Sequence, residues 1–129
     1  MFHVDIMSDE AVYLSLQHRL EILVQQVSDG DIASDMGPQL MQFWQQELAL
    51  MEGDSLSPDI YNQWRSLHTE VHRELRLLNM DLMFLGSSRS ASIQSVRQKA
   101  AGDRLEKLLR YCEQIQSIIA LDDPHKPAE

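Results

Sequence analysis

The chain has 129 residues, of which 43% are hydrophobic and 24% are charged, and it carries a formal net charge of −9. This acidic surface would repel a phosphate backbone, which argues against nucleic acid as a partner. A lone cysteine excludes an internal disulfide, and no apolar run approaches the roughly 18 residues of a membrane span, so we expect a cytoplasmic protein without membrane binding.

Two shorter helices are predicted in the N-terminal half. The first covers residues 9–28, where apolar side chains recur at spacings of three and four and therefore share one face. The second begins at Gly37-Pro38, since proline is tolerated in a first helical turn, and ends at Gly53. The predicted inward residues are Val12, Leu16, Leu20, Leu23 and Val27 in the first helix, and Leu40, Phe43, Trp44, Leu48 and Met51 in the second.

Two longer helices are predicted in the C-terminal half. Ser57-Pro58-Asp59 has the pattern of a helix start: a hydroxyl cap, a proline in the first position and an acid in the first turn. The third helix runs from there to Gly86, and the fourth begins within Ser87–Ser92 and ends before Asp122. The predicted inward residues are Ile60, Trp64, Leu67, Val71, Leu75, Leu78, Leu82 and Leu85 in the third helix, and Ile93, Val96, Ala100, Leu105, Leu108, Cys112, Ile115 and Ile119 in the fourth.

The predicted fold class is all-α. No segment combines strict alternation of apolar and polar residues with β-branched and aromatic enrichment, so we expect no strands. Short connectors favour antiparallel neighbours, which predicts a four-helix up-down bundle with a long C-terminal helical hairpin. A chain of this length has room for one hydrophobic core. We therefore expect a single domain over residues 1–121 and a flexible C-terminal tail over residues 122–129.

Two histidines form the most suggestive pair for chemistry. His68 and His72 lie four residues apart on the third predicted helix, a spacing that stacks two imidazoles on one face, as a zinc site requires. His68 lies on the flank of the apolar stripe and His72 turns toward solvent, which favours two surface histidines and leaves a metal site as the alternative. Cys112 falls on an inner stripe, where a thiol behaves as a small apolar residue. Without a glycine-rich nucleotide loop either, we expect no enzyme activity, no cofactor and no metal.

The charges are unevenly distributed along the chain. Residues 1–63 carry eleven acids and one base, whereas residues 64–110 carry nine bases and five acids. The basic residues of the predicted C-terminal hairpin could meet an acidic surface of a partner, or they could form a solvated face with local ion pairs. They are Arg73, Arg76, Arg89, Arg97, Lys99, Arg104, Lys107 and Arg110.

The end of the third predicted helix is apolar on nearly every side. Leu77, Met80, Met83 and Phe84 point away from the inner stripe, and the serine-rich segment that follows cannot cover them. Either the connector Asp31–Met36 and the second helix fold over them, or a second subunit or another protein does. The candidate partner-binding residues are Arg73, Arg76, Leu77, Met80, Met83, Phe84, Arg89 and Arg97.

Several segments of this hairpin resemble the cyanobacterial PatD proteins, described as heterocyst frequency control proteins. They are Val71–Leu78, Asp81–Leu85, Asp103–Leu105 and Leu109–Cys112, within a match that covers residues 64–115. The resemblance implies a small cytoplasmic regulator without a cofactor, which contacts the tubulin-like division protein FtsZ, modulates its assembly and so links cell division to heterocyst frequency. It supplies no residue-level binding motif. The alternative is a homodimeric helical adaptor or assembly factor with an unrelated protein partner.

Overall fold

The computed structural model describes residues 9–32, 35–87 and 90–122, and the regular elements within them are all helical. Helix α1 spans Asp9–Asp29, α2 spans Met36–Phe43, α3 spans Pro58–Ser87 and α4 spans Ala91–Leu121. A π-helical turn at Trp44–Leu48 continues α2. The prediction of an all-α fold is confirmed.

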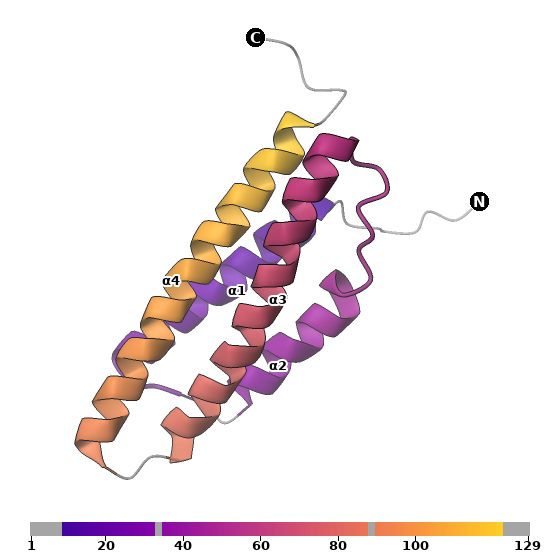
Figure 1. Cartoon of the computed structure of the whole chain (residues 1–129). Helices are drawn as coiled ribbons and strands as arrows, with labels where there is room; N and C mark the ends of the chain where they lie inside the picture. The colour runs from indigo at the N-terminus through magenta and orange to yellow at the C-terminus, as the bar shows by residue number, and fades with distance from the viewer. Residues whose placement is uncertain (1–8, 33–34, 88–89, 123–129) are drawn as a thin grey trace.

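Consecutive helices run in opposite directions, and α3 and α4 form a long hairpin (Figure 1). Helix α4 packs against both α1 and α3, and α2 packs against the other side of α3. Helices α3 and α4 have 30 and 31 residues, whereas α1 has 21 and α2 has 8. The structure is therefore an up-down bundle in which one pair of helices is much longer than the other.

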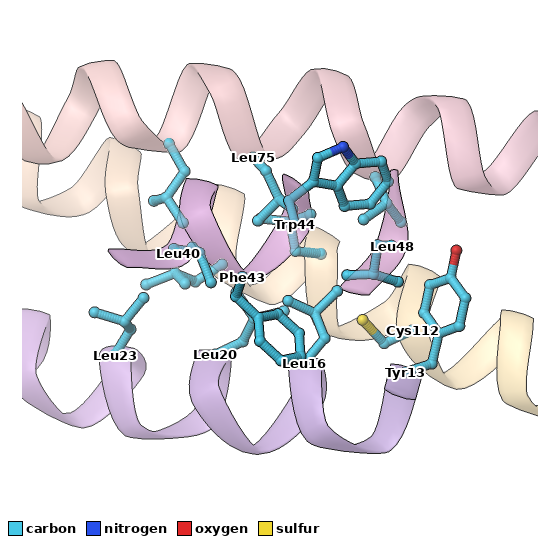
Figure 2. Packing of buried hydrophobic residues seen from close by; sticks show 14 of the residues in the cluster. Tyr13, Leu16, Leu20, Leu23, Leu40, Phe43, Trp44, Leu48, Leu75 and Cys112 are labelled. Carbon is cyan, nitrogen blue, oxygen red and sulfur yellow. The ribbon is translucent and has the colours of Figure 1, made fainter. Parts of the chain in front are cut away.

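One hydrophobic core joins the helices. In Figure 2, Leu16, Leu20 and Leu23 of α1 face Leu40 and Phe43 of α2. The five inward residues that the sequence predicts for α1 are all buried, and Tyr13 is buried with them. Outside α1, the fully buried core includes Leu48, Leu75, Leu105, Leu108 and Ile115.

The first turns of α4 depart from the prediction. Ile93, Val96 and Ala100 were expected to point inward, but all three are exposed. The side chain of Gln98 donates to carbonyl oxygens at the end of α1, so the turns of α4 before this point extend beyond α1. Because α1 offers no surface there to cover them, these side chains face solvent, and the inward position is taken by the fully buried Ala101.

The second helical segment is also shorter than predicted, since it ends at Leu48 and not at Gly53. The N–H of Ala49 donates to the carbonyl of Trp44 at 2.8 Å, which closes the wide π-helical turn. Met51, predicted to be inward, is half-buried in the following connector. Gly53 has a φ of +68°, and a Cβ there would lie 2.7 Å from the ring of Trp64, so only glycine lets the connector cross this ring.

The start of α3 is tied to the end of α4. The hydroxyl of Ser57 donates to the carboxylate of Asp122 at 2.6 Å, and the backbone N–H of Ser57 donates to the same carboxylate at 3.0 Å. These hydrogen bonds lower the pKa of Asp122. The predicted tail thus begins with a residue that contacts the bundle, and its other positions, 123–129, lie outside the described residues. No helix in the described ranges is long and apolar enough to cross a membrane.

Candidate functional site

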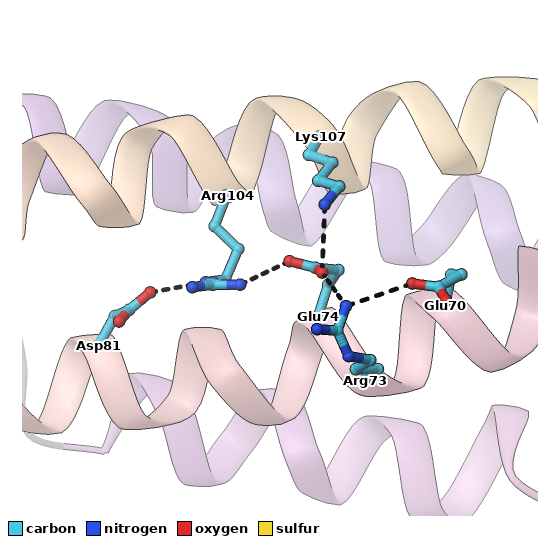
Figure 3. Close-up of polar contacts among 6 residues, drawn as sticks. All are labelled: Glu70, Arg73, Glu74, Asp81, Arg104 and Lys107. Atoms are coloured by element: carbon cyan, nitrogen blue, oxygen red, sulfur yellow. Dashed lines mark hydrogen bonds and ion pairs between the residues drawn. The ribbon is translucent and has the colours of Figure 1, made fainter.

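A network of ion pairs connects the middle of α3 to α4 (Figure 3). Glu74 is only 1% exposed, although it is charged. One carboxylate oxygen of Glu74, Oε1, lies 2.6 Å from Nη1 of Arg104. The other, Oε2, lies 3.1 Å from Nη1 of Arg73 and 3.4 Å from Nζ of Lys107. The Nε atom of Arg104 also binds Asp81 at 2.7 Å. Burial acts to lower the pKa of Arg104, but the hydrogen bonds to both acids outweigh it and raise that pKa.

This network accounts for much of the basic face that the sequence indicates. Arg73, Arg104 and Lys107 are each paired with an acid, and Lys99 pairs with Asp103 at 3.2 Å on the exposed side of α4. Local ion pairs therefore neutralise the middle of the hairpin. Among the described residues of this face, Arg76, Arg97 and Arg110 make no ion pair and are available for a charged contact.

Exposed apolar side chains gather at the closed end of the hairpin, on the last turns of α3 and the first turns of α4. We call this group the tip patch. It consists of Met80, Met83, Phe84, Ile93 and Val96, which are 42–70% exposed. Exposed apolar side chains grouped in this way commonly mark interaction sites.

Helix α2 does not cover the tip patch. Gly37 at the start of α2 packs so closely on Asn79 that an added Cβ would clash with its side-chain oxygen. Further along α3, Met80 and Met83 remain 47% and 63% exposed. The connector Asp31–Met36 was the other segment that could fold over these side chains. Its positions 33–34 lie outside the described residues, and its last residue, Met36, is buried in the core.

A groove lies beside the tip patch, between α3 and α4. Its volume is about 420 Å³. Arg97 lies at its edge, with its guanidinium carbon 4.5 Å from the centroid of the Phe84 ring. The lining residues are Asp81, Ser92, Ile93, Val96, Arg97 and Ala100.

The structure brings some of the predicted partner-binding residues together and separates others. Phe84 and Arg97 are in contact, and Met80 and Met83 lie on the same exposed stripe of α3. Arg76 is exposed on α3, whereas Leu77 is half-buried. Arg73 belongs to the ion-pair network, and Arg89 lies outside the described residues.

Three residues that line the groove were predicted to lie in the core. Ile93, Val96 and Ala100 continue the apolar repeat of α4, but all three are exposed. The signal that could have identified them is the unequal length of the predicted helices, because the inward repeat of α4 continues past the point where α1 can cover it.

The two histidines belong to an aromatic cluster and not to a surface pair. The ring of His68 lies between Trp44 and Trp64, at centroid distances of 4.8 and 4.6 Å, and its Nδ1 is hydrogen-bonded to the Tyr13 hydroxyl. His72 stacks on the same Trp44, with an angle of 6° between the rings. Burial, with a smaller effect of His72, lowers the pKa of His68 to about 4. The imidazole of His68 is therefore neutral at physiological pH.

Candidate metal ligands do not cluster among the described residues, and the cysteine is buried. Among them, no group of three or more His, Cys, Asp or Glu side chains is arranged to hold a metal ion. Cys112 is fully buried, and burial raises the pKa of its thiol to about 12. Since the thiolate is the nucleophile, burial and the raised pKa both act against reaction of this thiol in the folded chain.

Comparisons with protein-family models, with curated proteins and with solved structures found no match to this chain. The candidate site therefore rests on the geometry of the hairpin. Its parts are the tip patch, the adjoining groove and the stacked Arg97, at the end of two helices that the buried Glu74 ties together.

Proposed function

We propose that this chain is a non-enzymatic regulatory protein that binds the cell-division protein FtsZ through the tip of the α3–α4 hairpin and modulates its assembly. The identity of the partner is taken from the resemblance of residues 64–115 to the PatD proteins. In a heterocyst-forming cyanobacterium, such binding would link cell division to the frequency of heterocysts.

The observation that supports binding at this surface is the tip patch itself. Its five apolar side chains are exposed at the end of a hairpin that the ion pairs of Glu74 hold in register. Apolar anchors supply most of the affinity of a protein interface, and neighbouring arginines supply orientation and salt sensitivity. A face that is formed before binding also reduces the entropy cost of association.

The test is FtsZ assembly with GTP, followed by light scattering and co-sedimentation at physiological salt. We expect a dose-dependent change with the wild-type chain and a weaker change with Met83→Ser. The matched control is Leu50→Ser, which removes an equally apolar side chain that is 80% exposed but lies after α2. Unchanged scattering together with no co-sedimentation would refute the role in FtsZ assembly.

A further inference from the structure

The groove at the hairpin tip has the chemistry of a site for one kind of protein segment. We propose that it binds a short segment of a partner protein in which an acidic side chain lies next to a bulky apolar one. This inference deepens the proposed function, since it concerns the same surface. It does not require that the partner is FtsZ.

The walls of the groove favour an apolar side chain. Ile93 and Val96 line it from α4 and are 52% and 70% exposed. Asp81 lines it from α3, but its carboxylate is already paired with Arg104, whose Nε lies 2.7 Å from Oδ2 of Asp81. An apolar group can therefore enter without meeting an uncompensated negative charge, and it would gain the free energy of burial against both aliphatic side chains.

Arg97 supplies the polar contact. The face of Phe84 holds its guanidinium at 4.5 Å, in the geometry of a cation–π interaction. The N–H donors of a guanidinium lie in its plane, so stacking on a ring leaves them free to bind a carboxylate with two parallel hydrogen bonds. In the described ranges no carboxylate pairs with Arg97, and a carboxylate of the partner would complete this geometry.

The local charge decides between an acidic partner and a second copy of this chain. Positions 76–100 contain four basic residues and one acid, in a chain whose net charge is −9. A two-fold symmetric dimer through the tip would place each surface against itself and bring like-charged arginines together. An acidic segment instead meets complementary charge, which also accelerates association.

Anionic lipid is the other partner that a basic and apolar surface could suit. The groove argues against it, because a single side chain fits between the two helices, whereas a flat membrane surface would leave the groove unfilled. The remainder of the acidic chain would also be repelled by anionic headgroups. We therefore assign the groove to a peptide and treat lipid binding as an outcome that would overturn the assignment.

The experiment measures fluorescence anisotropy of three short labelled peptides with the whole chain, at low and at physiological salt. The first peptide alternates leucine and phenylalanine with aspartate and glutamate. The second replaces its acids with lysine, and the third replaces its apolar residues with serine. We expect the first peptide to bind at least about tenfold more tightly than either of the others, and more weakly as salt rises.

Matched variants locate the binding. Arg97→Glu should weaken the first peptide by about tenfold or more, whereas Arg110→Glu, which makes the same change of charge at an exposed position further along α4, should have little effect. Val96→Ser should weaken binding, whereas Leu50→Ser should not. All four positions are partly or largely exposed, so circular dichroism should show folded variants.

Three results would overturn the inference: equal affinity for the three peptides, equal effects of Arg97→Glu and Arg110→Glu, or binding to phosphatidylserine vesicles that Arg97→Glu abolishes. A concentration-dependent dimer that Val96→Ser dissociates would also overturn it in favour of a second copy. If FtsZ assembly responds but the peptide preference is absent, the proposed function stands and this inference fails. If the preference holds without any effect on FtsZ, the partner is a different acidic protein.

Discussion

Replacing Glu74 with glutamine should destabilise the bundle, because it removes the charge on which three cations converge. Breaking a buried ion pair costs about 3–5 kcal/mol when the stranded charge stays buried. Here the side chains of Arg104, Lys107 and Arg73 are 25%, 42% and 56% exposed, so water can take up part of what the carboxylate supplied. Arg104 also keeps Asp81. We therefore expect a loss of about 2 kcal/mol in the free energy of unfolding.

The assay is urea unfolding followed by circular dichroism, with thermal melts in parallel. For a domain of this size, a loss of about 2 kcal/mol corresponds to a fall of roughly 5–10 °C in melting temperature. The matched control is Asp103→Asn, which breaks the pair with Lys99 where both side chains are at least 65% exposed. That substitution should cost less than about 0.5 kcal/mol.

Salt separates the two cases further. The effect of Asp103→Asn should vanish at high salt, whereas most of the effect of Glu74→Gln should persist, since ions screen a buried carboxylate poorly. If Glu74→Gln costs no more than Asp103→Asn, the buried carboxylate contributes nothing beyond an exposed one. The ion pairs of Glu74 would then not be what holds the two long helices in register.

Three further predictions concern single residues of the helices. Gly37→Ala should cost about 1–2 kcal/mol, because its Cβ would meet Asn79, whereas Gly102→Ala, with nothing within 4 Å, should stabilise α4 by up to about 1 kcal/mol in thermal melts. The pKa of His68 is lowered from 6.5 to about 4, so between these pH values the unfolded chain binds a proton that the folded chain does not. The stability that His68 contributes is therefore full above pH 6.5 and falls as the pH drops toward 4. Between pH 6.5 and pH 4, the free energy of unfolding measured with urea should fall by about 2–3 kcal/mol more for the wild-type chain than for His68→Gln. Parallel pH dependences of the two proteins would contradict the prediction. Cys112 should resist a thiol reagent at mild alkaline pH until urea unfolds the chain, and rapid labelling of the native protein would show that it is accessible.

Local patterns in the sequence predicted the helices well. The first helix was predicted over residues 9–28 and spans Asp9–Asp29, and the third was predicted from Pro58 to Gly86 and spans Pro58–Ser87. These bounds depend on residues close in sequence, namely the apolar repeat and the proline, glycine and acidic residues that flank it. The fold class followed from the same repeats.

Features that depend on neighbouring helices could not be predicted in this way. Whether Ile93 and Val96 are buried depends on how far α1 extends, and the repeat within α4 carries no such information. The burial of Glu74 requires Arg104 and Lys107 from another helix. Likewise, the position of His68 between two indole rings requires Trp44, which the packing of the second helical segment against α3 brings close.

The same difference in helix length explains why an apolar surface stays exposed on so small a bundle. Helix α4 has 31 residues and α1 has 21, and the residues of α4 before Gln98, which contacts the end of α1, extend about 10 Å at 1.5 Å per residue. If α1 were as long, it would cover part of this end. The five side chains of the tip patch are 42–70% exposed. Burying them fully would contribute about 5 kcal/mol of free energy that the isolated chain does not gain. Helical hydrogen bonds satisfy the backbone of the overhanging turns, and the ion pairs between Glu74, Arg104 and Asp81 tie α3 to α4 just before them. The overhang can therefore keep its shape without its own core, and a partner that covers it recovers the burial that the shorter helices do not provide.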